Sequence, residues 1–553
     1  MKLTDKIENS FLIDNITSEQ RSFLSAVLNM GIDFLEGKTR DNKVLIYKGN
    51  EDLKKVLDCD LPKEGVSNNE ILNILKNKIL KYSISQHDNR YLSFPDTGNS
   101  ISGIAGDILN SFLNQNMIAV ERSAPIATFV EIQLILWLRE IIGYPTLTLQ
   151  KLNSVGELGG LWTSGGNMSN HIAILAALHN KFPQVKEKGL ASLKNTPSIV
   201  LAGGVDHFSF KSAAKSLGIG EEGLIWATAN SNYTTNTESV EMLLKNSASK
   251  NTFMVVAVAG NCRTTSIDNL IKLSEICKKY NVWFHIDACH GGSLLFSEKL
   301  RKKLGGIEYS DSVSIDPHKG LFVTYPSSYV LFKNPDHLTC FSRYPDKTKE
   351  NGNYDLGLIT PFYGSRGFDS LKLWLLIKQL GITGLGKAIE KREDNYLELH
   401  HRLEETSYFV FLNKPTFYRS AFVFCPSIVR DKVKRINCCK QKKVFFSIIN
   451  KYTKIFCDKL YQSGQAIFDL FQLEDRENKI GLELTDKFTA MALAVGHPFI
   501  KEETKQKLLD QINIVASELR INMLDEIETT LSLDSSVEKI PLQDSYSTSP
   551  ASW

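Results

Sequence analysis

The stretch that most constrains the fold of this chain runs from Trp283 to Lys319. It opens with the apolar segment Trp-Phe-His-Ile-Asp, which ends on Asp287, and it closes with Ser-Val-Ser-Ile-Asp-Pro-His-Lys. Each half has the length and composition of a short buried strand, followed by polar residues. The first predicted strand thus delivers Asp287 to its carboxyl end, and the second delivers His318 and Lys319.

The region around this stretch repeats the same alternation of strand and helix. Apolar runs are separated by helix-length segments such as Ile267–Tyr280, whose apolar residues recur at helical spacing. Alternating strands and helices predict an α/β fold with a mostly parallel sheet, in which ligands bind at the carboxyl ends of the strands. The predicted strands are Ser198–Leu201, Phe253–Ala259, Val282–Ile286, Ser312–Ile315 and Ser328–Phe332.

An aspartate and a lysine at neighbouring strand ends suit a site for pyridoxal 5'-phosphate (PLP). A desolvated lysine amine can form an imine with the cofactor aldehyde, and a carboxylate keeps the pyridine nitrogen protonated. A buried carboxylate is costly without a cationic partner, so Asp287 is expected to pair either in a structural ion pair or with a pyridinium. The alternative for Lys319 is an ordinary surface lysine.

A glycine-rich turn opens a predicted helix within Thr163–Ala173. Without side chains at Gly165 and Gly166, backbone N–H groups can approach an anion, and the helix amino terminus adds positive partial charge. By itself this pattern more often marks a plain loop-to-helix turn. The lysine and aspartate downstream favour phosphate binding.

His207 follows another predicted strand and the turn Gly203-Gly204. At a strand end its imidazole can lie flat on a bound aromatic ring, although a lone histidine is more often structural. We give that structural interpretation to His171, His179, His285 and His290. Because the histidines show neither HExxH-type spacing nor cysteine partners, we predict no metal site.

Length, charge and cysteine content limit the class of protein. A chain of 553 residues is expected to form two or three domains. A formal charge of +3 without a long basic block argues against nucleic acid or membrane partners. Nine cysteines without a CxxC pair and an amino terminus without an apolar signal core predict a cytoplasmic protein with reduced thiols. The most hydrophobic helix, Ala127–Gly143, is charged and too short to span a bilayer.

The predicted domains follow the changes in pattern along the chain. Residues 1–125 form an N-terminal helical segment with a loop at Tyr91–Ser100, residues 126–400 a large domain, and residues 401–520 a small C-terminal domain. Residues 521–553, rich in Ser, Asp and Pro after about Leu533, are predicted to be disordered. Further predicted elements are helices at Ile104–Gln115, Ala127–Ile142, Leu371–Phe409, Phe445–Phe471 and Glu502–Leu519, and strands at Ala421–Cys425 and Ala490–Ala494.

The order of these motifs from about Phe94 to about Leu519 resembles the group II PLP-dependent amino acid decarboxylases. That family contains the glutamate, aromatic amino acid and diaminobutyrate decarboxylases. The residues that carry the resemblance are Thr163–Asn170, Asp206-His207, Gly260–Leu270, His285–Ala288, Asp316–Lys319, Arg366–Trp374 and Ser123–Pro125. The resemblance implies the PLP-dependent transferase fold (aspartate aminotransferase-like, fold type I), with a small C-terminal α+β domain. It also implies a homodimer with sites at the subunit interface.

The resemblance further implies a role for each matched residue. Lys319 would hold PLP as an internal aldimine, Asp287 would pair with the ring nitrogen, and His207 would stack on the ring and help to protonate the substrate carbon. Other cofactor contacts would come from Gly165, Gly166, Asn167, Cys262, Ala288 and His318. The substrate pocket would be lined by Phe94, Pro95 and Thr97. No role is assigned to Arg366, and Asp316 stands where the glutamate and aromatic branches carry asparagine.

These roles imply decarboxylation of an L-amino acid to its amine and CO2. In many members a loop tyrosine donates a proton; here Tyr354, Phe362 and Tyr363 all fall near that position, and Tyr354 is our candidate. A phenylalanine there would instead allow oxidative deamination to an aldehyde, and a lyase on the same fold is another alternative. A scaffold protein would need none of the site residues. Asp96 would suit a cationic substrate or merely form a turn.

Overall fold

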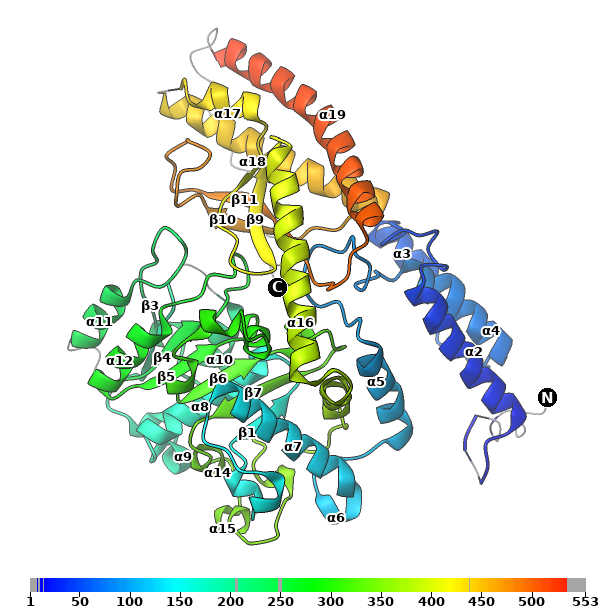
Figure 1. Cartoon of the computed structure of the whole chain (residues 1–553), viewed down its shortest axis with the longest axis vertical. Coiled ribbons are helices and arrows are strands. Elements are labelled where there is room, and N and C mark those ends of the chain that lie inside the picture. Colours follow the sequence, from blue (N-terminus) through cyan, green and yellow to red (C-terminus); the bar gives the residue numbers. More distant parts are fainter. Residues whose placement is uncertain are drawn as a thin grey trace.

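Two β-sheets, each with its own hydrophobic core, organise the chain (Figure 1). The structure is a computed structural model, and it describes residues 7, 10–12, 14–203, 207–246, 251–436 and 438–534. The larger sheet has seven strands in the order β1-β7-β6-β5-β4-β2-β3, and the smaller has four in the order β10-β11-β9-β8.

The larger sheet is mostly parallel, which confirms the predicted fold class. Strands β2 to β6 pair in parallel, whereas β7 pairs antiparallel with β6, and β1 antiparallel with β7. Every residue of β5, β6 and β7 is buried, so both faces of the sheet are covered. The strands are β1 (Gly160–Thr163), β2 (Ser198–Leu201), β3 (Leu224–Trp226), β4 (Thr252–Val258), β5 (Trp283–Asp287), β6 (Ser312–Ile315) and β7 (Ser328–Phe332).

The sequence predicts the central strands within two residues but misses the two outer ones. Strand β1 starts at Gly160, where a Cβ atom would lie 2.6 Å from Ile135 and from Leu331. Close packing therefore requires a glycine at a position where strands usually carry a larger side chain. Strand β3 has only three residues and exposes Trp226 at its end. Neither segment has the apolar alternation from which a strand is recognised.

Helices cover the larger sheet. Helix α8 packs across β4 to β7, α7 packs against β1 and β7, and α12 packs against β4 and β5. Helix α12 begins at Leu270, later than predicted, because the Asn269 side chain caps it by accepting from the Lys272 N–H (3.1 Å). The helices are α5 (Ile101–Leu113), α6 (Val120–Ser123), α7 (Pro125–Ile142), α8 (Gly166–Lys181), α9 (Val185–Lys188), α10 (Phe208–Ser216), α11 (Thr237–Lys245), α12 (Leu270–Tyr280), α13 (Pro317–Gly320), α14 (Asp336–Thr339) and α15 (Pro345–Thr348).

The smaller sheet is antiparallel and packs against α18. Its strands are β8 (Phe409–Phe411), β9 (Arg419–Phe424), β10 (Leu470–Glu474) and β11 (Lys487–Ala494), and its helices are α17 (Ser427–Val433), α18 (Cys439–Ser463) and α19 (Glu502–Asp534). The predicted helix Phe445–Phe471 was wrong at its carboxyl end. Gly464 takes a left-handed conformation (φ 69°) and caps α18, and β10 follows.

Helix α16 (Ser370–Glu405) runs from the larger sheet to the smaller one and is kinked at Gly381, whose φ of 61° and ψ of 176° are not helical (Figure 1). It ends before the predicted Phe409, because Ser407 has a positive φ of 59° and the chain then enters β8. Near its start it packs against α5 and α7, and further along it contacts β8.

Both ends of the described chain are helical. Helices α2 (Ser18–Leu35), α3 (Asn50–Leu57) and α4 (Asn68–Ile74) project from the body of the molecule, and none of their residues is buried (Figure 1). At the other end α19 continues to Asp534, so the predicted disorder is wrong for 521–534. Buried Met523 and Ile527 extend the apolar face of that helix. Residues 535–553 lie outside the described residues.

Candidate active site

A cavity at the carboxyl ends of β4, β5 and β6 brings together most of the predicted cofactor residues. Of these, Gly166, Asn167, His207, Cys262, Asp287 and Lys319 line it. Gly165, Ala288 and His318 adjoin these residues in the chain. The remaining lining residues are Val258, Gly260, Asn261, Cys289 and His290.

Lys319 lies on the one-turn helix α13, directly after β6, and forms an ion pair. Its Nζ is 2.9 Å from Oδ2 of Asp316, a carboxylate that is almost completely buried and also accepts from the Ser328 hydroxyl. Burial lowers the pKa of the Lys319 amine, but the negative charge of the Asp316 carboxylate beside it outweighs this effect, so the pKa lies well above its ordinary value. Without cofactor, the Lys319 side chain is therefore an ammonium rather than the neutral amine expected from desolvation alone.

Asp287 ends β5, as predicted, and points its carboxylate at the cavity without a cation beside it. Its Oδ2 accepts from Asn170 Nδ2 (3.0 Å) and its Oδ1 from the Cys289 N–H (3.1 Å). Within the described part of the chain it makes no ion pair. An 8% exposed carboxylate that only accepts two neutral donors suits a cationic ligand such as a pyridinium.

His207 caps the amino terminus of α10 rather than ending a strand. Its Nδ1 accepts from the Ser209 N–H (3.3 Å) and lies 2.7 Å from Ser209 Oγ. This arrangement leaves Nε2 as the nitrogen that carries the proton in the neutral ring. Asp206, the other half of the motif, lies outside the described residues.

The glycine turn places the amino terminus of α8 at the cavity. A Cβ atom on Gly166 would lie 2.5 Å from Cys289 Sγ and 2.8 Å from Asp316 Oδ2. Helix α8 can therefore approach the end of β6 this closely only with glycine at position 166. The first N–H groups of a helix have no acceptor within it and attract anions. His318 is held by the Ser327 N–H (3.2 Å to Nδ1) and by the Tyr325 ring, 4.4 Å between centroids.

The predicted pocket loop lies against the smaller sheet. A Cβ atom on Gly496 would lie 2.5 Å from Thr97 Cγ2 and 2.7 Å from the Pro95 carbonyl oxygen, so the loop packs directly on the chain after β11. Asp96 is buried and accepts from the Tyr325 hydroxyl, while its other oxygen has no hydrogen-bond partner among the described residues. Burial raises the pKa of Asp96, which favours its neutral form.

Arg419 is a residue that the sequence interpretation missed. It begins β9 and is 1% exposed; its Nη2 is 2.7 Å from Asp469 Oδ2, and its guanidinium lies 5.1 Å from the centre of the Phe94 ring. In the described chain its Nε and Nη1 have no hydrogen-bond partner. Burial raises the pKa of the cavity residue Cys262 and lowers that of His290, and the positive charge of Arg419 acts to lower both. The available signal was an arginine two residues before the predicted strand Ala421–Cys425.

The loop aromatics do not line the cavity. The Tyr354 hydroxyl donates to the Leu152 carbonyl (2.9 Å), and its ring packs on Phe129. The Tyr363 hydroxyl lies 2.7 Å from Ser164 Oγ, beside the glycine turn, and Phe362 is exposed. One chain alone therefore brings neither tyrosine hydroxyl to Lys319.

Arg366, for which the sequence assigned no role, has a structural contact. Its guanidinium pairs with fully buried Glu131 and lies 5.1 Å from the centre of the Trp162 ring. This pair ties the end of the 344–365 loop to α7.

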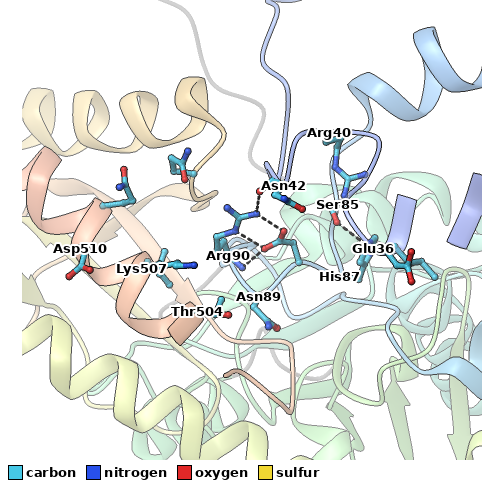
Figure 2. Close-up of a pocket in the computed structure, with 16 residues that line it drawn as sticks. Glu36, Arg40, Asn42, Ser85, His87, Asn89, Arg90, Thr504, Lys507 and Asp510 are labelled. Carbon is cyan, nitrogen blue, oxygen red and sulfur yellow. Dashed lines mark hydrogen bonds and ion pairs between the residues drawn. The ribbon is translucent and has the colours of Figure 1, made fainter. Parts of the chain in front are cut away.

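Pockets larger than this cavity lie elsewhere, and the predicted site residues do not line them. One opens between the N-terminal segment and α19 (Figure 2). Two of its charged groups already have partners: Arg90 pairs with Asp88 at 2.8 Å, and Arg40 donates to the Phe34 carbonyl at 3.1 Å. In the described residues no cluster of His, Cys, Asp and Glu could hold a metal ion. Over the same residues, no helix combines the length and apolarity needed to cross a membrane.

The site residues fit PLP. The cavity offers a lysine for the aldehyde, a carboxylate without a cationic partner for the ring nitrogen, an imidazole for the ring and a helix amino terminus for the phosphate. The fold and this set of groups together define a PLP-dependent enzyme of fold type I.

Comparison with known proteins identifies the family. The family model described as "Pyridoxal-dependent decarboxylase conserved domain" matches residues 50–424. The chain belongs to this family of PLP-dependent carboxy-lyases, which confirms the resemblance seen in the sequence.

Relatives agree with this assignment, and solved structures agree with the fold. The chain is 28% identical over 437 residues to the acidic amino acid decarboxylase GADL1 of Xenopus tropicalis, covering 77% of this chain and 82% of the relative. It is 29% identical over 427 residues to glutamate decarboxylase of Drosophila melanogaster, covering 74% and 80%. The structure of mouse CSAD superposes with a TM-score of 0.79 at 23% identity, covering 90% and 99%. That of Rhodiola rosea 4-hydroxyphenylacetaldehyde synthase superposes with a TM-score of 0.72 at 17% identity, covering 94% and 99%.

Proposed function

We propose that this protein removes CO2 from an amino acid, with Lys319 as the residue that holds the cofactor. The observation that carries the proposal is the convergence of Lys319, Asp287 and the start of α8 on one cavity. Bound PLP supplies the electron sink that makes bond cleavage at the substrate α-carbon possible. The protein decides which bond breaks and where the proton goes.

Each group then has a task that its surroundings support. Asp287, kept as an acceptor by Asn170 and the Cys289 N–H, would hold the ring nitrogen protonated. His207 would face the ring with Nε2–H as a donor. Gly166 and Asn167, at the start of α8, would bind the phosphate through backbone N–H groups.

We further propose that the substrate is an acidic amino acid. Arg419 supports this choice, because a buried guanidinium with two nitrogens that lack partners among the described residues is suited to a carboxylate. The names of the relatives, an acidic amino acid decarboxylase and a glutamate decarboxylase, point to the same class. Asp96 does not oppose it, since burial favours its neutral, protonated form.

Aldehyde formation is a second candidate, favoured by the loop. Phe362 is 44% exposed, while the Tyr354 hydroxyl is already bound to Leu152. Such a reaction takes up O2 and water and releases CO2, ammonia and hydrogen peroxide together with the aldehyde. Product analysis for amine against aldehyde, with oxygen consumption followed in parallel, separates the two. Tyr354→Phe should abolish amine formation only if Tyr354 is the proton donor.

We also propose a homodimer. The projecting N-terminal helices expose Leu24, Leu28 and Ile32, and α5 exposes Ile101 and Phe112. Exposed apolar side chains in such numbers are typical of an interface. A second subunit could also bring a loop tyrosine to the cavity. Sedimentation analysis of the wild-type protein and of Leu28→Glu tests whether the protein forms a dimer and whether this face forms the interface. The nine free thiols suit a reducing compartment such as the cytoplasm.

The main test combines cofactor binding with product detection. Purified protein given PLP should gain the visible absorption of a lysine-bound cofactor and release CO2 from glutamate, aspartate or a sulfinic analogue. Lys319→Ala should lose both, whereas Lys302→Ala, at an exposed position, should lose neither. Absence of the absorption band from the wild-type protein would contradict the proposal.

A further inference from the structure

A directional hydrogen-bond network lies behind Asp287, and it starts at an obligatory donor. Trp283, His285 and Asp287 share one face of β5, because alternate residues of a strand point the same way. The Trp283 indole N–H donates to Ser312 Oγ on β6 (2.9 Å). An indole can only donate, so Ser312 Oγ accepts from Trp283, and the same oxygen lies 2.8 Å from Nδ1 of the His285 ring.

The His285 ring links Ser312 to Asn170. Burial lowers its pKa to about 4, so the ring is neutral and carries a single proton. The Asp287 carboxylate can only accept, so Asn170 turns its Nδ2 toward Asp287 and its Oδ1 toward His285. Because Oδ1 can only accept, the proton of His285 sits on Nε2, which donates to it (3.1 Å), and Nδ1 then accepts from the Ser312 hydroxyl (2.8 Å). The structural interpretation of His285 made from the sequence is therefore incomplete, since the ring reaches the residue that contacts Asp287.

The Asn170 amide is fixed by these contacts. Its Oδ1 accepts from His285 and also from the Ser314 hydroxyl (2.8 Å), so its Nδ2 must face the other way. There it donates to Asp287 Oδ2 (3.0 Å) and to Ser209 Oγ (3.0 Å). Asn170 is fully buried on α8, and both of its amide protons are used.

The last link reaches His207. Ser209 Oγ accepts from Asn170, so its own proton is directed to His207 Nδ1, 2.7 Å away. The Ser209 backbone N–H donates to the same nitrogen (3.3 Å). One amide thus sets the hydrogen bonding of the carboxylate at the ring nitrogen and of the imidazole at the ring face.

We propose that Asn170, held in one orientation by His285 and Ser314, is the positioning residue that holds Asp287 as an acceptor and His207 as an Nε2–H donor toward the cofactor. This inference rests on the proposed function, because it assigns Asp287 and His207 to PLP. Asn170 itself touches neither cofactor nor substrate in this scheme and acts through its two neighbours.

The variant Asn170→Asp tests the proposal with little change in shape. It replaces the donor with an acceptor, puts a second carboxyl group beside Asp287, and allows the Ser209 hydroxyl to turn away from His207. PLP affinity of the apoprotein should fall about tenfold to hundredfold, as expected when a buried charge loses a hydrogen-bond donor. The control is Asn236→Asp, which adds the same charge but keeps the N-cap of α11, because aspartate caps as well as asparagine.

A second readout follows the protein without cofactor. Nitrogen NMR of histidine-labelled apoprotein should show His285 and His207 both protonated on Nε2 in the wild type. In Asn170→Asp and in Ser209→Ala, the Nδ1 signal of His207 should shift, while that of His285 stays. Thermal unfolding of each variant, compared with wild type, identifies loss of folding.

The outcomes separate this inference from the proposed function. Equal PLP affinity in Asn170→Asp and Asn236→Asp, with unchanged His207 signals, would overturn the role of Asn170. If Asn170→Asp does not fold, Ser209→Ala decides, and an unshifted His207 signal again overturns it. A wild-type protein that binds no PLP but shows the two predicted tautomers would refute the proposed function and still support the network. A His285 protonated on Nδ1 would refute the network alone.

Discussion

The Lys319 ammonium lies 2.9 Å from the buried carboxylate of Asp316, three residues earlier on the same turn. Asp287, the carboxylate assigned to the cofactor ring, makes no ion pair within the described residues. The two acidic groups at the strand ends therefore have different roles. Asp316 stabilises the charged form of Lys319, and Asp287 remains available for a cationic ligand.

This pairing predicts how the apoprotein captures PLP. An amine attacks an aldehyde only when deprotonated. Burial alone would lower the pKa of Lys319, but Asp316 raises it, so capture by the wild type should accelerate toward alkaline pH. Asp316→Asn should move this dependence to lower pH and speed capture near neutrality, about tenfold for each unit by which the pKa falls.

Stopped-flow absorbance of apoprotein mixed with PLP over a range of pH measures this effect. Asp336→Asn is the matched control, because it also removes a 2.9 Å lysine pair, but an exposed one, with Lys349. Superimposable pH profiles for the two variants would show that Asp316 does not control the lysine.

The two glycines at the start of α8 should differ in their tolerance of a methyl group. Gly166→Ala would put Cβ 2.5 Å from Cys289 Sγ and 2.8 Å from Asp316 Oδ2, and so push the helix away from the cavity. Gly165→Ala meets no atom within 4 Å and has an extended backbone (φ 174°). PLP affinity, measured by titration, should fall at least about tenfold in the first variant and remain within a few-fold of wild type in the second. Equal affinities would argue against a phosphate site at this turn.

Arg419 should determine the preference for acidic substrates. Arg419→Gln removes the charge but retains donors, and kcat/KM for the acidic amino acid should fall about hundredfold, the effect expected for a lost charge-assisted hydrogen bond. Arg476→Gln is the control, because the guanidinium of this arginine already has partners: it pairs with Glu474 at 3.0 Å and donates to the Ala229 carbonyl at 3.2 Å. Unchanged kcat/KM in Arg419→Gln would remove the acidic substrate from the proposal.

His400 should make the protein sensitive to acid. Burial lowers its pKa from 6.5 to about 4, so the unfolded chain binds a proton in this pH window that the folded chain does not. Stability should therefore be complete above pH 6.5 and decline as the pH falls toward 4, by up to roughly 1.4 kcal/mol per pH unit.

Urea unfolding at several pH values measures this decline. The slope should become shallower in His400→Gln, which removes the buried titrating ring. The adjacent and exposed His401 provides the control, and His401→Gln should keep the wild-type slope. A slope that is the same in all three proteins would assign the acid sensitivity to other groups.

The sequence by itself determined the frame of the site. The apolar runs that became β4, β5 and β6 are local patterns, and the residue after a parallel strand must lie at its carboxyl edge, so Asp287 and Lys319 could be placed together. The glycine turn was equally local. The order of these motifs was sufficient to identify the family, because each motif occupies only a few adjacent residues.

Only the tertiary structure decided which groups pair at that edge. Arg419 comes from the second sheet, a hundred positions after Lys319, and Asn170 meets Asp287 because α8 crosses β5 and β6. Two aspartates were possible partners of Lys319, one at the end of β5 and the other directly after β6, and the geometry of α13 decided between them. Pairing across elements is set by helix packing and sheet order, and these follow from the sum of many weak contacts rather than from any short pattern.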